Sequence, residues 1–178
     1  MLAIPSGGVP VGRIVADRLG SAFDVMVVRK IRIPWEPEAG FGAVTWNGKA
    51  LKMLHLTQKE IDHYISVTKE EIVRRVEKFR GDQPFPHLTG KSVILIDDGL
   101  ASGFTMLAAV KSVVKLGPRW VVVAVPTASK AALNLVTPYV DELVCLNIRD
   151  EIFYAVADAY REWHDLQDEE VLTYLKKH

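Results

Sequence analysis

The sequence predicts an α/β fold in which a parallel twisted sheet is flanked by helices. Three apolar runs rich in β-branched residues, at 23–28, 92–96 and 120–125, have the pattern of strands that are buried on both faces. Segments with helical periodicity separate these runs, and such alternation predicts parallel strands joined by right-handed crossovers. The length of 178 residues is typical of one domain, so we expect a single domain over 1–178.

The composition excludes several classes of protein. The chain has 22 basic and 22 acidic residues, and this balance gives no sign of a nucleic-acid or membrane surface. Met1 leads into an apolar segment without a basic leader, and no apolar run reaches transmembrane length, so we expect a cytoplasmic protein. The single Cys145 excludes an intramolecular disulfide, and its apolar neighbours predict a buried core thiol.

The N-terminal segment predicts a strand, a glycine-rich loop and a helix. Leu2 to Ile4 is a short apolar run, and P-S-G-G-V-P-V-G follows it. A helix is expected next, ending at Gly20. A glycine-rich loop between a strand and a helix can bind an anion, although a purely structural turn is the alternative. The next strand, 23–28, ends in Arg29 and Lys30.

The segment 31–70 interrupts the alternating pattern and is predicted to be an insert. Residues 41–53 alternate around Asn47-Gly48, which predicts a β-hairpin. Residues 57–80 are helical, and two cap-like starts predict a short helix followed by a longer one. The basic side chains of the longer helix are interpreted as a solvated face; they are Arg74, Arg75, Lys78 and Arg80.

The remaining chain continues the strand and helix alternation. The strand at 120–125 is expected to end at Pro126. A terminal helix is expected to be capped by Asp168. The other elements expected are a helix at 105–116, a helix at 128–136, a strand at 142–146 and the terminal helix at 168–177.

The most informative stretch is V-I-L-I-D-D-G-L-A-S-G-F-T at 93–105. Two carboxylates, Asp97 and Asp98, follow a buried strand, and a loop of small residues then leads into a helix. Converging backbone N–H groups and a helix N-terminus favour an anion, and hydroxyls at Ser102 and Thr105 add donors. Acids beside such a loop suggest a ligand with vicinal hydroxyls or a divalent cation. A sugar phosphate meets both requirements.

The run D-D-G-L-A-S-G-F-T resembles the phosphoribosyl pyrophosphate (PRPP) loop of the type I phosphoribosyltransferases. The resemblance implies a parallel sheet with a lid or hairpin insert at 31–70 and a small hood at 147–178. It implies that Asp97 and Asp98 are the catalytic residues, holding the ribose hydroxyls and Mg²⁺. The PRPP-binding residues would be Asp97, Asp98, Gly99, Leu100, Ala101, Ser102, Gly103, Phe104 and Thr105.

The N-terminal loop resembles the pyrophosphate-binding loop of the same family, with one departure. The family commonly carries a basic residue before the two glycines, and this chain has Ser6. Gly7 and Gly8 would bind pyrophosphate through the backbone, assisted by a metal or another cation. Arg29 or Lys30 is a candidate for that cation, and a solvated pair at a strand end is the alternative.

The segment 149–165 resembles the hood of purine phosphoribosyltransferases. There an aromatic side chain stacks on the base and an acid follows several positions later. By position, Phe153 or Tyr154 would stack and Asp158 would be the acid, although aromatic residues at this spacing also serve in cores.

Together these features predict transfer of ribose 5-phosphate from PRPP to a nitrogenous base, of purine type, with release of pyrophosphate. PRPP and a nucleobase would be the partners, Mg²⁺ the cofactor, and a homodimer or higher homo-oligomer the assembly. Ala101 stands where hypoxanthine–guanine enzymes have an aspartate, which argues against their usual mechanism. Two alternatives stay open: a PRPP-binding regulator on the same fold with little turnover, and an unrelated sugar-phosphate or nucleotide-binding protein.

Overall fold

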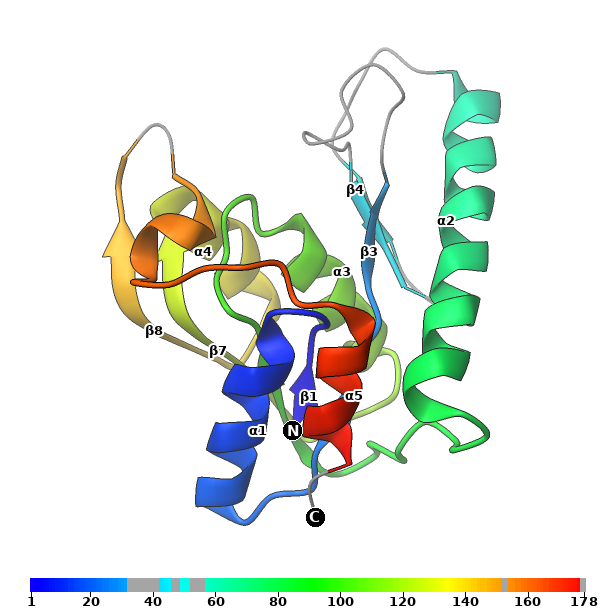
Figure 1. Ribbon diagram of the computed structural model, residues 1–178. Helices are drawn as coiled ribbons and strands as arrows, with labels where there is room; N and C mark the ends of the chain where they lie inside the picture. Colours follow the sequence, from blue (N-terminus) through cyan, green and yellow to red (C-terminus); the bar gives the residue numbers. More distant parts are fainter. Residues whose placement is uncertain (32–41, 46–48, 52–56, 152–153, 177–178) are drawn as a thin grey trace.

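A five-stranded parallel sheet forms the centre of the molecule (Figure 1). The computed structural model describes residues 1–31, 42–45, 49–51, 57–151 and 154–176. The strands of this sheet are β1 (Leu2–Ala3), β2 (Asp24–Val25), β6 (Ser92–Ile96), β7 (Trp120–Ser129) and β8 (Glu142–Arg149). Their order is β2-β1-β6-β7-β8, which confirms the predicted parallel α/β fold and places the N-terminal strand inside the sheet.

Alternate residues of the central strands enter two hydrophobic clusters on opposite faces of the sheet. Leu95 belongs to one cluster and Ile96 to the other, and Leu2 and Ala3 divide in the same way. The continuous apolar runs in the sequence follow from this burial on both faces. The helices that contribute to the first cluster are α3 (Phe104–Val114) and α4 (Lys130–Val136), and those of the second are α1 (Gly8–Leu19), α2 (Gln58–Arg80) and α5 (Asp168–Leu175).

A second, antiparallel sheet lies between α2 and α3 (Figure 1). Its strands are β3 (Arg29–Ile31), β4 (Gly42–Val44) and β5 (Lys49–Leu51). Pairing of β4 with β5 confirms the expected hairpin, while its turn lies outside the described residues. The expected strand at 23–28 is wrong in extent, because only Asp24 and Val25 pair with β1 before the chain passes into the second sheet at Arg29.

The prediction of two helices over 57–80 is also wrong, since α2 is one continuous helix. Its start is as expected: the Glu60 N–H donates to Thr57 Oγ1 over 3.3 Å, and the Glu60 carboxylate accepts the Thr57 N–H at 2.8 Å. The buried side chains of Ile65 and Ile72 form one stripe that spans the proposed break. Packing along this stripe outweighs the second cap-like signal at Ser66.

The strand β7 continues through Pro126 to Ser129, where we expected it to stop. The last residue of β7 that pairs with β6 is Ala124. Pro126 lies beyond this ladder, so its missing N–H removes no hydrogen bond from it. The extension has a consequence for the next helix, which begins at Lys130 with Ser129 as its N-cap, two residues later than expected.

The C-terminal helix α5 begins with Asp168, but its N-cap is Gln167. The Gln167 N–H donates to the Glu170 carboxylate over 2.8 Å, so Glu170 supplies the acidic partner at this helix end. The predicted capping role of Asp168 is therefore wrong, and its carboxylate is directed toward α2.

The strand β8 forms an edge of the sheet and is covered on one face. Val144, Leu146 and Ile148 are 41%, 83% and 57% exposed, whereas Cys145 on the other face packs against the first cluster. Cys145 is only partly buried, which corrects the expectation of a core thiol. Within the described residues, no helix combines the length and apolar composition that crossing a bilayer requires.

Candidate functional site

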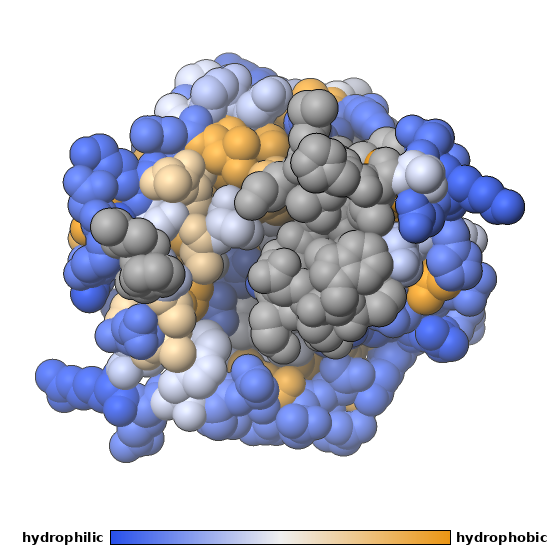
Figure 2. Space-filling model, turned by 90° about the horizontal axis from the view of Figure 1, so that it is seen from above, coloured by the Kyte–Doolittle hydropathy of each residue, from blue (hydrophilic) through white to orange (hydrophobic). Residues whose placement is uncertain are grey.

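A cleft of about 700 Å³ opens beside the carboxyl ends of β1 and β6. This is the edge at which open α/β sheets bind ligands. Seen from above in Figure 2, this end of the molecule is mainly hydrophilic around its rim, with apolar patches on part of the face. Seven residues predicted from the sequence line the cleft: Ser6, Gly7, Arg29, Lys30, Asp97, Asp98 and Thr105.

The two predicted loops are in direct contact at Gly7 and Gly8. A Cβ atom at position 7 would overlap the Asp98 carboxylate, and one at position 8 would lie 2.9 Å from the Ile96 carbonyl oxygen. Rotation of a new side chain at position 7 or 8 cannot relieve these overlaps, because the overlapping atom is the Cβ itself. The two glycines therefore allow the N-terminal loop to lie against the carboxylate pair.

The carboxylate pair is half-buried at the cleft and carries unfavourable charge. The Asp98 N–H donates to Asp97 Oδ1 over 2.9 Å. Burial raises the pKa of Asp97 well above its ordinary value, and the neighbouring Asp98 charge raises this pKa further. The pKa of Asp98 is also raised, mainly by burial. Of the two carboxyls, Asp97 is the one that more readily keeps a proton, and a bound cation would favour the charged forms.

The donor set at the pair fits Mg²⁺ when a phosphate-bearing substrate supplies further ligands. Among the residues that the structure describes, no three His, Cys, Asp or Glu side chains are grouped to hold a metal ion. Mg²⁺ commonly takes only one or two carboxylates, with waters and substrate phosphates completing its shell. Asp97 and Asp98 are the residues that would hold it.

The loop after the pair is anchored to the extended part of β7. The Leu100 N–H donates to the Thr127 carbonyl over 3.0 Å, and the Ser129 N–H donates to the Leu100 carbonyl over 2.9 Å. Ser129 Oγ also donates to the Ala101 carbonyl over 2.7 Å. The continuation of β7 past Pro126 therefore holds the PRPP-like loop in place.

The predicted cradle residues divide between lining the cleft and shaping the loop. Thr105 lines the cleft, whereas Ala101 and Ser102 are exposed and Phe104 packs on the core. Gly103 has a φ of 77°, in the left-handed region that favours glycine.

A side chain at Gly99 would meet the hood, because its Cβ would lie 2.7 Å from Val156. Gly99 and Gly103 therefore allow the loop to turn and pack closely without lining the cleft.

Two backbone N–H groups of the N-terminal loop already donate within the same segment. The Gly8 N–H donates to the Ile4 carbonyl and the Val9 N–H donates to the Ser6 carbonyl, each over 3.1 Å. The peptide bond between Pro5 and Ser6 is cis. Ser6 itself is half-buried, and its hydroxyl offers the cleft no charge.

The two cations predicted at the end of the second strand do reach the cleft. Arg29 is held by Glu71 of α2, with Nη2 3.2 Å from Oε2. Lys30 is exposed, and its charge lowers the pKa of Asp97 in opposition to the larger effect of burial.

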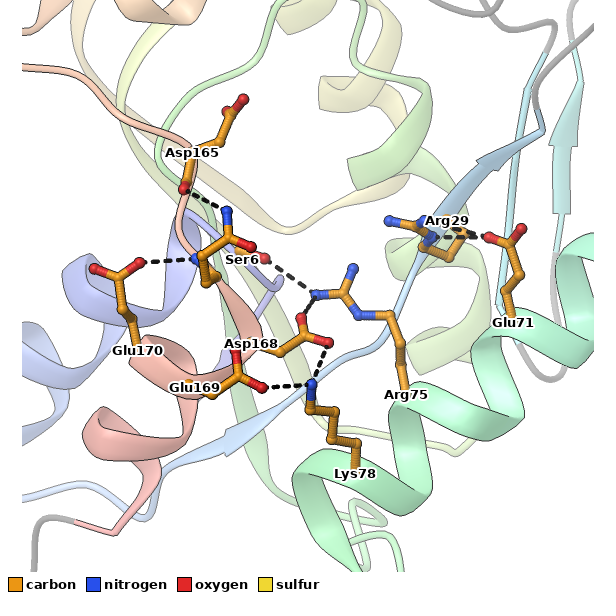
Figure 3. A network of polar contacts seen from close by, with 10 residues as sticks. Ser6, Arg29, Glu71, Arg75, Lys78, Asp165, Asp168, Glu169 and Glu170 are labelled. Atoms are coloured by element: carbon orange, nitrogen blue, oxygen red, sulfur yellow. Dashed lines mark hydrogen bonds and ion pairs between the residues drawn. The ribbon is translucent and has the colours of Figure 1, made fainter.

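Sequence reasoning missed Arg75, which it assigned to a solvated helix face. Figure 3 shows Arg75 reaching from α2 toward Ser6, and its Nη2 donates to Ser6 Oγ over 3.1 Å. A signal was available in the helical period, because Arg75 follows the buried Ile72 by three residues and precedes the buried Phe79 by four. That spacing places Arg75 on the packed face of α2.

Of the predicted base-binding residues, the two that the structure describes lie outside the cleft lining. The Tyr154 hydroxyl is 2.7 Å from Thr127 Oγ1, and the Asp158 carboxylate accepts the Ala155 N–H at 3.1 Å. Phe153 lies outside the described residues.

Other aromatic residues of the hood do line the cleft, and sequence reasoning did not single them out. Among them are Tyr160, whose hydroxyl donates to the Asp98 carbonyl over 2.7 Å, and Trp163, which packs edge-on against Tyr160. Their position follows from the turn before them, which no local pattern in the sequence specifies.

Comparison with known proteins places the chain in a family. Residues 1–161 match the family model described as the phosphoribosyl transferase domain. Two Mycobacterium tuberculosis proteins, from strains CDC 1551 and H37Rv, bear provisional phosphoribosyl transferase names and are each 35% identical over 99% of this chain. The chain spans only 41% of the length of these relatives.

A solved structure agrees with this comparison over nearly the whole chain. The crystal structure of TT1426 from Thermus thermophilus is 36% identical, with a TM-score of 0.79, covering 98% of this chain and 85% of that one. The matched family model includes both loops that meet at the carboxylate pair. The chain belongs to the phosphoribosyl transferase domain family.

Proposed function

We propose that this chain transfers ribose 5-phosphate from PRPP to a nitrogenous base, of purine type, and releases pyrophosphate. The observation that carries this proposal is the contact between the carboxylate pair and the Gly7–Gly8 loop at the edge of one cleft. The pair suits vicinal ribose hydroxyls, and the loop lies where the pyrophosphate attached to the same ribose would extend. Membership of the family supports this assignment.

The residues of the cleft would act mainly by positioning and by charge. Cleavage at C1 of the ribose passes through an oxocarbenium-like state, in which positive charge develops on the sugar while negative charge leaves with pyrophosphate. Asp97 and Asp98 would hold the ribose hydroxyls, and the cations Arg29 and Lys30 lie where they can attract the departing group. Bound Mg²⁺ would neutralise part of the pyrophosphate charge.

The acceptor base would lie against the hood side of the cleft. Trp163 is 42% exposed and lines the cleft, so its indole face offers a stacking surface there. The base-binding residues implied by the resemblance remain Phe153, Tyr154 and Asp158. Among the described aromatic residues that line the cleft, we assign the stacking role to Trp163. Ala101 is exposed and carries no acid, so no side chain at this position can transfer a proton to the base.

The test is pyrophosphate release from PRPP and Mg²⁺, measured across adenine, guanine, hypoxanthine, xanthine, uracil and orotate. Release that depends on a purine supports the proposal and identifies the acceptor. Release that depends only on a pyrimidine keeps the transferase and rejects the purine assignment. Calorimetric binding of PRPP without release for any base would instead favour the regulatory alternative.

The Trp163→Ala variant should raise the KM for the base more than that for PRPP.

A second copy of the chain is the partner we propose for the exposed edge. The apolar stripe of Val144, Leu146 and Ile148 lies on a strand at the edge of the sheet. Edges of this kind associate readily unless they are covered. Light scattering should show a homodimer or larger assembly that Leu146→Glu weakens, and a monomeric wild type would reject this proposal. A single domain and a cytoplasmic location remain predictions, and a role in nucleotide salvage would follow from the proposed reaction.

A further inference from the structure

The pyrophosphate side of the cleft lacks the charge that its loop would ordinarily carry. Ser6 is neutral, and the N–H groups of Gly8 and Val9 already donate to carbonyls within the same segment. Pyrophosphate bears several negative charges, and burying them beside two carboxylates requires a compensating cation. Arg29 is engaged with Glu71, which leaves Lys30 as the other cation of that pair in the cleft lining, for a group that bears several charges.

The Arg75 side chain lies at the place where the loop cation is missing. Its guanidinium contacts Ser6 Oγ at 3.1 Å and lines the same cleft as the carboxylate pair. The side chain is only 15% exposed, and its guanidinium packs 4.9 Å above the Phe79 ring. Arg75 thus reaches the loop from a rigid helix, at a sequence separation of 69 residues from Ser6.

A second anchor orients Arg75 from the C-terminal helix. Asp168 Oδ1 accepts a hydrogen bond from Arg75 Nη2 at 2.9 Å, and Asp168 Oδ2 lies 3.0 Å from Lys78 Nζ (Figure 3). One carboxylate is therefore shared between two cations, and Lys78 has a second carboxylate partner in Glu169, whose Oε1 lies 3.0 Å from Lys78 Nζ. The buried Arg75 Nε has no hydrogen-bond partner in the part of the chain that the structure describes. Since a guanidinium has five N–H donors, Arg75 retains donors for an anion.

We propose that Arg75 supplies the cation that Ser6 does not, and that it binds the pyrophosphate group of PRPP. The planar guanidinium can donate two parallel hydrogen bonds to phosphate oxygens, which a loop serine cannot do. Asp168 is the positioning residue, because it holds the guanidinium beside the loop without entering the cleft lining. This inference deepens the proposed function and depends on it for the identity of the substrate.

A purely structural role is the competing explanation. Arg75 and Asp168 also join α2 to α5, and an ion pair of this kind can serve packing alone. The two roles differ in which ligands they affect. Loss of a pyrophosphate contact weakens ligands that contain pyrophosphate, whereas loss of packing weakens the fold and all ligands alike.

The experiment compares Arg75→Met with Arg74→Met, which removes the exposed neighbouring cation of the same helix. Calorimetry with Mg²⁺ measures the affinity of each variant for PRPP, inorganic pyrophosphate and ribose 5-phosphate. Arg75→Met should weaken PRPP and pyrophosphate by about 10- to 100-fold and leave ribose 5-phosphate within about twofold. Arg74→Met should leave all three affinities near those of the wild type. Equal losses for all three ligands, or none, would overturn the assignment.

Two further variants protect the test against a folding defect. Asp168→Asn removes the ion pair but keeps Arg75, so it should weaken pyrophosphate affinity less than Arg75→Met does and leave ribose 5-phosphate affinity within about twofold. Ser6→Arg in the Arg75→Met background returns a cation to the loop and should restore part of the lost affinity, and no recovery with an unchanged melting temperature counts against the proposal.

The outcomes also separate this assignment from the proposed function. A wild type that binds PRPP while Arg75→Met binds it equally well rejects only the role of Arg75. A wild type that binds pyrophosphate through Arg75 but not PRPP rejects the proposed function instead. A wild type that binds neither rejects both.

Discussion

The two loops that meet in the cleft obtain their chemistry in different ways. The loop at 97–105 carries its acids, glycines and hydroxyls in one continuous stretch. The N-terminal loop provides glycines and a hydroxyl, while cations reach it from β3 and from α2. A local motif therefore describes the first loop almost completely, and the second only in part.

The difference shows which part of a site tolerates a change of sequence. Gly7 and Gly8 have no room for a side chain because they touch the backbone or side chains of Ile96 to Asp98. Position 6 has no such contact, and another element can supply charge there. A cation can come from any element that reaches the cleft, whereas the close contact of two backbones depends on those glycines alone.

The largest effect is expected from Gly7→Ala, which tests the contact between the loops. The new methyl group overlaps the Asp98 carboxylate, so this carboxylate must turn away or the loops must separate. We expect a loss of about 1–3 kcal/mol in the free energy of unfolding, which is typical of overpacking. PRPP binding should fall below detection by calorimetry, because the Asp98 carboxylate is displaced.

The matched test adds Asp98→Ala to Gly7→Ala. Removing the carboxylate removes the atom that the methyl group strikes, so the double variant should be more stable than the sum of the two single changes predicts. PRPP binding should stay lost because the carboxylate is gone. Strict additivity of the two stability changes would show that the loops are not in contact.

The next effect is a pH dependence of stability that originates in the carboxylate pair. The pKa of Asp97 is raised in the folded state by burial and by the charge of Asp98. Between the unfolded value of about 4 and this raised pKa, the folded state binds more protons. The free energy of unfolding therefore decreases as pH rises through this range.

The Asp97→Asn variant should lose this pH dependence and be more stable than the wild type at pH 7. Chemical denaturation between pH 4 and pH 8 measures both quantities. In the wild type, affinity for PRPP with Mg²⁺ should rise over the same range, because the ligand requires charged carboxylates. A wild type that gains stability from pH 4 to pH 7 relative to Asp97→Asn would contradict the sign of the shift.

The smallest effect is expected from Tyr160→Phe, which separates the hood from the carboxylate loop. The Tyr160 hydroxyl donates to the Asp98 carbonyl over 2.7 Å, and its loss should cost about 1 kcal/mol of unfolding free energy. Tyr154→Phe is the control, since the Tyr154 hydroxyl lies 2.7 Å from Thr127 and not at the pair. Thermal melts should show similar losses, while only Tyr160→Phe should lower PRPP affinity.

The features that were predicted correctly depend on residues close together in the sequence. The parallel sheet followed from apolar runs buried on both faces, and the Thr57 cap followed from its spacing to Glu60. Pro126 was misjudged because its effect depends on where β6 ends, which is a property of another strand.

Arg75 was misjudged for the same reason. Its role depends on the proximity of α2, α5 and the N-terminal loop, and no local pattern states that proximity. Within its own helix, the spacing to Ile72 and Phe79 indicates a packed face but does not identify what lies opposite.

The role of the carboxylate pair is tested most directly by a calorimetric titration of PRPP, with Mg²⁺, into the wild type and into Asp98→Asn. We expect one PRPP bound per chain for the wild type and no detectable binding for the variant. The melting temperature of the variant should be equal to or above that of the wild type, because a buried charge has been removed. Equal affinity of the two proteins for PRPP would contradict the claim that the carboxylate pair holds the ribose.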